Sequence, residues 1–180
     1  MSETIRVTRE PDFFPLSAGL RLDYQLTSTE FAGTESVRVV IESVDAFRDD
    51  ARARVLLTRS RGGTESQVRY AVRRGRREIV SEGGVLGLAR REFPLPALVG
   101  KTWVEEPDRH EIASREASIA VPAGNFKNCL RVNVFLAGGD AGSAIRYYAP
   151  GVGYVYEEYS GEAWGARVQL IAFEFPRPAR

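Results

Sequence analysis

Apolar and polar residues alternate along most of this 180-residue chain, and this alternation constrains the fold more than any other feature. In the segment 20–27 every second residue is apolar, namely Leu20, Leu22, Tyr24 and Leu26. Residues two apart point to the same face of a β-strand, so the pattern indicates a strand with one buried and one solvated face. No segment sustains the apolar period of a helix. The sequence therefore predicts an all-β protein.

About ten segments of this kind follow one another, with glycine and proline turns between them. In the first half we expect strands at 20–27, 36–44, 51–59, 66–73 and 76–81. In the second half we expect them at 103–112 (broken by Pro107), 117–121, 129–136, 145–148, 153–159 and 167–175. We expect a short helix or a crossing loop at 82–91 and a helical turn at 125–128. Because nearly every connection is short enough for a hairpin, we predict an antiparallel up-and-down barrel or half-barrel rather than a sandwich, with at most short helical turns.

The length suits a single domain. We expect an N-terminal arm at 1–12, one β domain at 13–175 and a proline-stopped tail at 176–180. The domain divides into two similar halves, about 13–81 and 93–175. Each half opens with Phe-Pro-Leu, a spacer, a glycine and a bulky apolar residue three positions further on: Phe14, Gly19 and Leu22 in the first, Phe93, Gly100 and Trp103 in the second. We interpret the two copies as the same device for entering a strand.

Composition excludes several functions. The net charge is +1, from 25 basic and 24 acidic residues, whereas a dedicated nucleic-acid binder carries a clear basic excess. Cys129 is the only cysteine, so the chain forms no internal disulfide and no cysteine metal cluster. We expect no metal and no cofactor.

No apolar run is long enough for a transmembrane helix, and 1–14 has no signal-peptide core. We expect a cytoplasmic protein if Met1 is the native start, and an envelope protein if an export signal has been removed.

Two segments carry a resemblance to a known group of proteins. They read Val-Pro-Ala-Gly-Asn-Phe at 121–126, followed by Cys129 and Val132, and Tyr-Tyr-Ala-Pro-Gly-Val-Gly at 147–153, followed by Val155 and Glu157. Together they resemble the signature of an uncharacterised bacterial β-barrel-like family that is often exported or lipid-anchored. The resemblance implies the barrel fold and an envelope location, and it brings no catalytic residue.

The densest chemical feature is aromatic and lies at 145–175. Its members are candidates for contact with a ligand or partner: Tyr147, Tyr148, Tyr154, Tyr156, Tyr159 and Trp164. Packing between strands also accounts for such residues. Because Tyr147 and Tyr148 are neighbours on a strand, they point to opposite faces, so one set is expected in the core and the other on the surface. The same parity predicts that one of Glu157 and Glu158 points into the barrel.

Four arginines at one hairpin tip, Arg73, Arg74, Arg76 and Arg77, are candidates for anion contact, and a solvated tip is the simpler interpretation. His110, the only histidine, lies between carboxylates and could act as a general base with a nearby glutamate. Exposure at a turn or edge strand is the simpler interpretation of this residue. Cys129 opens an apolar strand, which favours a buried, inert thiol over a nucleophile.

These observations favour a non-enzymatic binding or assembly module, which presents a barrel mouth or an aromatic sheet face to an apolar small molecule or a protein partner. One alternative is a hydrolase-type enzyme that uses His110. The other is a structural subunit held in a larger assembly through edge strands. An internal apolar cavity favours the ligand binder, polar groups that converge on His110 favour the enzyme, and a long free strand edge favours assembly.

Overall fold

Residues 10–138 and 141–176 are described by the computed structural model, and they form a single antiparallel sheet of twelve strands. The first half contributes β1 (Arg21–Ser28), β2 (Phe31–Phe47), β3 (Asp50–Arg61), β4 (Thr64–Arg74), β5 (Glu78–Ser81) and β6 (Arg90–Pro94). The second half contributes β7 (Thr102–Glu105), β8 (Asp108–Val121), β9 (Gly124–Leu136), β10 (Gly142–Ala149), β11 (Gly153–Gly161) and β12 (Gly165–Glu174). The prediction of an all-β antiparallel barrel is confirmed.

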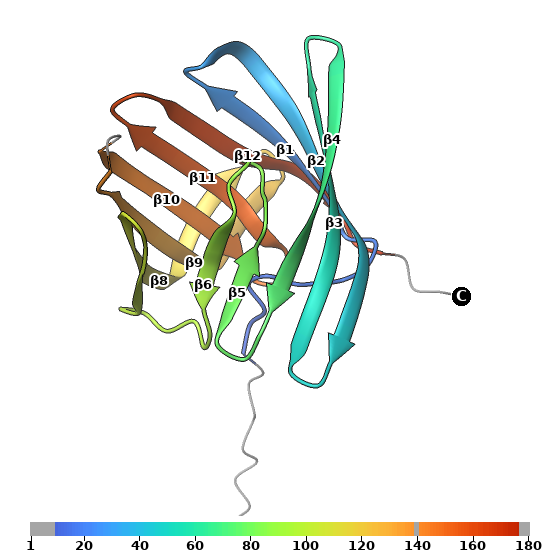
Figure 1. The fold of residues 1–180 in the computed structure, drawn as a ribbon, viewed down its shortest axis with the longest axis vertical. Coiled ribbons are helices and arrows are strands. Elements are labelled where there is room, and N and C mark those ends of the chain that lie inside the picture. Colours follow the sequence, from blue (N-terminus) through green and yellow to red (C-terminus); the bar gives the residue numbers. More distant parts are fainter. Residues whose placement is uncertain (1–9, 139–140, 177–180) are drawn as a thin grey trace, which may run out of the picture.

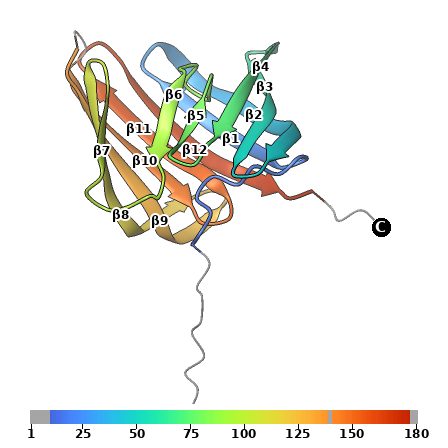
Figure 2. The ribbon, with the colours of Figure 1, turned by 60° about the horizontal axis from the view of Figure 1, so that its bottom comes forward.

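The sheet curls into a nearly closed barrel (Figures 1 and 2). Its strand order is β6-β5-β4-β3-β2-β1-β12-β11-β10-β9-β8-β7, so each half is an up-and-down meander and the two halves join where β1 pairs with β12. The two edge strands, β6 and β7, are neighbours in the sequence. Of the twelve strands, β6 has no counterpart among the eleven expected segments, because it forms in a stretch with little alternation. The turn at Pro107 separates β7 from β8, and the expected strand 117–121 is the end of β8.

The helical turn expected at 125–128 is wrong, because these residues belong to β9. The tight turn after Val121 brings Gly124 directly opposite it, and the ladder between β8 and β9 continues from there. Cross-strand pairing thus overrides the local tendency to turn. The backbone of β9 departs from regular strand geometry at Asn128, where φ is +54°, and this residue lies close to register shifts in β8. The segment 82–91 contains no helix, in agreement with the expected crossing loop up to its last two residues, which enter β6.

The two halves enter their first strands with the same hydrogen bonds. The Gly19 amide donates to the Ile41 carbonyl and the Gly100 amide to the Ile112 carbonyl, at 2.7 and 2.8 Å. Both glycines have positive φ, 87° and 84°, a conformation that residues with a Cβ rarely adopt. The residue after each glycine then accepts from the same isoleucine, at 3.0 and 2.9 Å. The repeated glycine therefore has one physical role at both positions.

Two segments close the barrel at its ends. The segment 11–20, which we call the floor segment, crosses one end (dark blue in Figure 1), where Gly151 donates a hydrogen bond to the Asp12 carbonyl. The loop 82–89, which we call the lid, extends from β5 to β6 over the interior. Residues 1–9 of the expected arm and 177–180 of the expected tail lie outside the described residues. Among the described residues there is no helix that could span a membrane.

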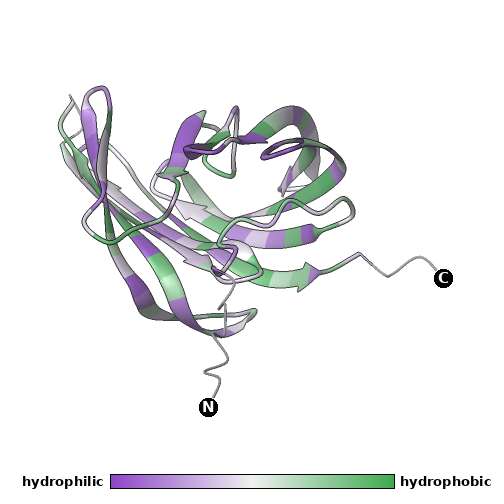
Figure 3. Cartoon of the chain, turned by 90° about the horizontal axis from the view of Figure 1, so that it is seen from below, coloured by the Kyte–Doolittle hydropathy of each residue, from purple (hydrophilic) through white to green (hydrophobic). Residues whose placement is uncertain are grey.

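Apolar side chains from both halves fill the barrel interior, and the hydropathy colouring shows how apolar and polar positions alternate along the strands (Figure 3). The interior residues come from every second position of the long strands, as the alternation predicts: Leu22, Tyr24 and Leu26 on β1, Val37, Val39 and Ile41 on β2, and Val132 and Val134 on β9. The exceptions are charged residues inside this core, and they define the candidate site.

Candidate functional site

A carboxylate lies at the centre of the barrel interior. Glu157, on β11, is 1% exposed. Its Oε2 accepts hydrogen bonds from Arg90 Nη1 and from the Tyr154 hydroxyl, both at 2.7 Å, and its Oε1 accepts one from Arg146 Nε at 3.1 Å. Buried charges are stable only when they are paired and hydrogen-bonded, and this carboxylate meets both conditions.

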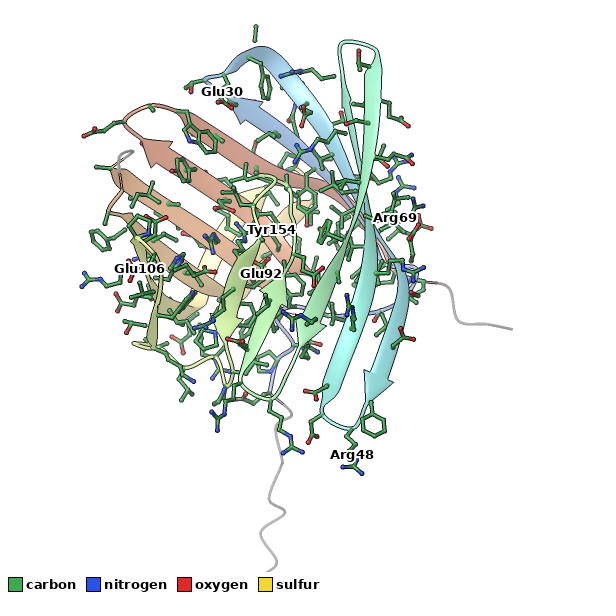
Figure 4. The ribbon with its side chains drawn as sticks, in the orientation of Figure 1. Glu30, Arg48, Arg69, Glu92, Glu106 and Tyr154 are labelled. Atoms are coloured by element: carbon green, nitrogen blue, oxygen red, sulfur yellow. The ribbon has the colours of Figure 1, made fainter. Side chains whose placement is uncertain are left out.

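A second buried carboxylate completes the group. Glu92, on β6, is 3% exposed, and its Oε2 accepts hydrogen bonds from Arg90 Nε at 3.0 Å and from the Tyr148 hydroxyl at 2.7 Å. Figure 4 labels Glu92 and Tyr154 inside the barrel, while Arg48 points away from it at a hairpin end. The group, which we call the buried network, consists of Arg90, Glu92, Arg146, Tyr148, Tyr154 and Glu157.

Two guanidinium groups and two carboxylates balance in the buried network. Burial alone would raise the pKa of Glu157, but the guanidinium groups of Arg90 and Arg146 and the Tyr154 hydroxyl outweigh it and hold this pKa at about 2. Burial and nearby carboxylates raise the pKa of Tyr148 and Tyr154 well above the usual value. At neutral pH the tyrosines are therefore uncharged donors and Glu157 is ionised.

Strand register explains how the network assembles. Arg146 on β10 lies directly opposite Glu157 on β11, on the interior face of an antiparallel pair. Opposite charges at paired positions attract each other across the strands. Arg90 and Glu92 bond to each other on β6, where Glu92 is the extra residue at a register shift in the pairing with β5, and the curl of the sheet brings this edge strand to the network. Its parts thus come from both halves of the barrel.

His110 lies beside the network with its ring enclosed. It is 3% exposed and stacks on the Trp103 indole, with ring centroids 5.0 Å apart. Burial, together with the nearby Arg146 and Arg90, lowers the pKa of His110 to about 4, so the ring is neutral at physiological pH. Glu105 Oε2 lies 3.5 Å from His110 Nε2 without hydrogen-bond geometry. The imidazole nitrogens, Trp103 Nε1 and Arg146 Nη1 are all buried without a hydrogen-bond partner in the described part of the chain.

An internal cavity adjoins the network. It offers about 60 Å³ to the centres of water-sized molecules, room for roughly four waters at the volume that one water needs. Its wall is mainly apolar, and its ionised residues are Arg90 and Glu92. The floor segment and the lid both line the cavity, and the remaining wall residues include Leu22, Tyr24, Val39, Val55, Tyr70 and Ser81.

The cavity and an open groove at the barrel mouth share one lining residue, which belongs to the lid. Val85 is 5% exposed and lines both spaces. The groove has a volume of about 540 Å³, and its walls include Phe31, Leu86 and Trp164. Arg59 fastens the lid, because its guanidinium donates to the Val85 carbonyl and pairs with Glu35 at 2.5 Å. We call this contact the latch.

The structure separates the six candidate aromatics by face. Tyr148 and Tyr154 are buried and belong to the network. Tyr147 and Tyr156 are half-buried and pack edge to face, with ring centroids 5.9 Å apart. Tyr159 and Trp164 stack at 4.3 Å near the mouth, where Trp164 lines the groove. The opposite orientation expected for Tyr147 and Tyr148 is therefore observed, and of the acidic pair Glu157 is buried and Glu158 exposed.

Carboxylates of the chain itself neutralise most of the candidate anion cluster. Arg74 donates to both Asp12 carboxylate oxygens and to the Phe14 carbonyl, which fixes the floor segment. Arg76 pairs with Asp49 at 2.7 Å, and Arg73 lies 3.8 Å from Glu82. Arg77 is exposed, and its backbone carbonyl accepts from Leu95. Three of the four arginines are thus paired with carboxylates of the chain itself, and Arg74 also holds the floor segment.

The remaining candidates are buried. Cys129 is 0% exposed, and burial raises the pKa of its thiol to about 11, so it is a protonated core residue within β9. The expectation of an exposed His110 at a turn or edge is wrong. The edge strand β7 pairs with β8 at this point, and its residue Trp103 lies opposite His110. No group of three or more metal-ligating residues occurs within 10–138 and 141–176.

Sequence reasoning missed Arg90, Glu92 and Arg146. The available signal was parity: Arg146 shares a strand face with Ala144 and Tyr148, so a charged residue occupies an apolar series. Arg90 follows a glycine-rich stretch without alternation, so no parity marks it, yet its side chain is only 12% exposed. A charged residue at an interior parity is thus the pattern that would have found the network.

The sequence matches no family model and no curated protein. Solved structures share the fold. A candidate exported protein with a YmcC-like fold from Bacteroides fragilis superimposes with a TM-score of 0.68 at 13% identity, covering 92% of this chain and 100% of that one. A candidate lipoprotein from Parabacteroides distasonis gives 0.63 at 15% identity, covering 91% and 99%. At these identities the likeness extends to the fold alone, and it agrees with the expected uncharacterised bacterial β-barrel-like domain.

Proposed function

We propose that this chain is a non-enzymatic binding module that holds a small, mainly apolar molecule inside its barrel. The supporting observation is a mainly apolar cavity that shares Val85 as a lining residue with an open groove. Burial of apolar surface supplies the affinity, at about 25 cal/mol per Å². A molecule larger than a few atoms enters when the lid moves and Val85 leaves its position. The names of both structural relatives, an exported protein and a lipoprotein, support an envelope location.

The lid is closed while the latch contact is formed and open when this contact is broken. In the closed state Arg59 holds the lid backbone at Val85, and Glu35 neutralises Arg59. Both charged side chains are part-buried at the mouth, with 25% and 11% exposure, so breaking the contact returns them to water at modest cost. The proposed route for a ligand therefore runs from the groove past Val85 into the cavity.

Calorimetric titration with n-octanol tests the proposal. Val55 is 2% exposed and lines the cavity, so Val55→Phe fills the space with its ring. We expect saturable binding to the wild-type chain and at least about tenfold weaker binding to Val55→Phe, because the ring takes the place of the ligand. Val68→Phe is the matched control, since Val68 is 52% exposed on β4 and lines none of these spaces. Absence of octanol binding to the wild-type chain refutes the proposal.

A free strand edge favours assembly as a second candidate function. β5 pairs with β4 only at Val72–Arg74, which leaves the backbone edge of 64–70 without a neighbouring strand among the described residues. Glu65 and Arg69 lie symmetrically about Gln67, so two copies of this edge in antiparallel pairing place opposite charges across from each other. Light scattering at rising protein concentration decides: a dimer that Glu65→Lys weakens supports this candidate, and a monomer throughout rules it out.

A further inference from the structure

Three polar groups on one wall of the cavity have no partner. The Tyr70 hydroxyl, the Ser81 hydroxyl and Arg90 Nη2 make no hydrogen bond within the described ranges, and all three residues line the cavity. Arg90 uses Nε and Nη1 for Glu92 and Glu157, so Nη2 is its remaining donor group. Ser81 is 2% exposed. The three side chains come from β4, β5 and β6, and each can donate a hydrogen bond to an acceptor in the cavity.

The balance of charges beside this wall determines whether the acceptor of a ligand can be charged. The buried network contains two guanidinium groups, Arg90 and Arg146, and two carboxylates, Glu92 and Glu157, so its net charge is zero at neutral pH. His110 is neutral beside it. A ligand carboxylate would add an uncompensated negative charge to a desolvated site, which is strongly unfavourable. An uncharged oxygen acceptor adds no charge and satisfies the free donors.

We propose that the cavity binds an uncharged molecule with a single alkyl chain and one carbonyl or hydroxyl oxygen. This oxygen accepts hydrogen bonds from Tyr70 and Arg90. This proposal rests on the proposed binding function and names its ligand class. The apolar remainder of the molecule runs past Val85 toward the mouth groove, where Phe31 and Trp164 offer aromatic contact area. The site thus has a donor-rich wall, an apolar interior and an aromatic exit.

Three probes of equal chain length test the ligand class by calorimetric titration of the full chain at neutral pH: n-octanol, methyl hexyl ketone and octanoate. We expect the alcohol and the ketone to bind and octanoate to bind at least about tenfold more weakly, because its charge is not compensated. If neither neutral probe binds, the binding function itself fails. If octanoate binds as tightly as the neutral probes, the binding function holds and the ligand class is refuted.

Two hydroxyl-deleting variants locate the oxygen. Tyr70→Phe removes a hydroxyl that bonds to no other described residue, so the fold is retained, and we expect ketone affinity to fall about three- to tenfold. Tyr156→Phe is the matched control on the outer face, where the hydroxyl bonds to Glu158 at 2.5 Å. Its ketone affinity should equal that of the wild type. Equal affinity for the ketone in all three proteins refutes the assigned oxygen position.

Discussion

At the residue scale, the main feature is a set of ionised side chains inside an apolar barrel. Parity along the strand predicted that either Glu157 or Glu158 would point inward, and the structure places Glu157 there. Parity also marks Arg146 as inward-facing, but it could not bring Arg90 to Glu157, because that contact joins β6 to β11 and depends on how far the sheet curls. Buried charges of this kind add little net stability relative to apolar residues, but removing one partner is strongly unfavourable.

Glu157→Gln tests the importance of charge balance. The change leaves Arg90 and Arg146 with one carboxylate between them, and we expect the free energy of unfolding to fall by about 3–5 kcal/mol. Urea denaturation measures it. Glu158→Gln is the matched control, since Glu158 is exposed and should change stability by less than about 0.5 kcal/mol. Similar losses in both variants would contradict the assignment of a buried network.

His110 predicts how stability depends on pH. Its pKa is about 4 in the folded chain and 6.5 without burial, so the unfolded chain binds an extra proton as the pH falls between these values. Stability therefore decreases from pH 6.5 to 4, by on the order of 3 kcal/mol for this group. We expect His110→Gln to flatten this part of the pH profile, measured by urea denaturation. A profile of unchanged slope would show that His110 titrates normally.

At the element scale, turn chemistry was more predictable than the positions of the short strands. Proline followed by glycine is typical of the central positions of a type II turn, and at Pro150-Gly151 the structure has a φ of 75° at Gly151, with Val152 donating to Ala149 at 3.2 Å. β6 was not predicted because its apolar residues follow no alternation. It forms through pairing with β5 and through the polar contacts of Arg90 and Glu92.

Gly151→Val tests the turn. An added Cβ would meet no atom within 4 Å, so the cost comes from the backbone conformation alone. We expect a loss of about 1–3 kcal/mol in the free energy of unfolding, because a β-branched residue is strained at this φ. Gly151→Asn should lose clearly less, since asparagine tolerates the left-handed region. Equal losses in the two variants would contradict this explanation.

The lid offers a sharper test of the entrance. A Cβ on Gly83 would lie 3.0 Å from the Tyr70 ring, so Gly83→Ala displaces the lid or the ring. We expect faster octanol association by stopped-flow mixing, because the lid spends more time open. Gly84→Ala is the control, since its nearest contact is an ordinary 3.8 Å. Association rates that do not differ between these variants would indicate that the ligand enters elsewhere.

At the scale of the whole molecule, the barrel was predictable and its interior was not. Alternation and short connections implied an up-and-down sheet, and the repeated Phe-Pro-Leu and glycine segments marked the start of each meander. How far the sheet curls depends on its twist and on which segments close its ends. The cavity therefore emerges from the positions of the floor segment, the lid and Val85 together, and no local sequence pattern places these three relative to one another.

The proposed site places a neutral, mainly apolar molecule in the cavity behind Val85. A crystal of the full chain soaked with an ω-brominated methyl hexyl ketone tests it most directly, because anomalous scattering locates the bromine. We expect a bromine peak on the line from the cavity past Val85 to the mouth groove, with the ketone oxygen within hydrogen-bond distance of the Tyr70 hydroxyl. A bromine peak only on the outer face of the barrel, or an unchanged interior in the soaked crystal, would contradict this placement.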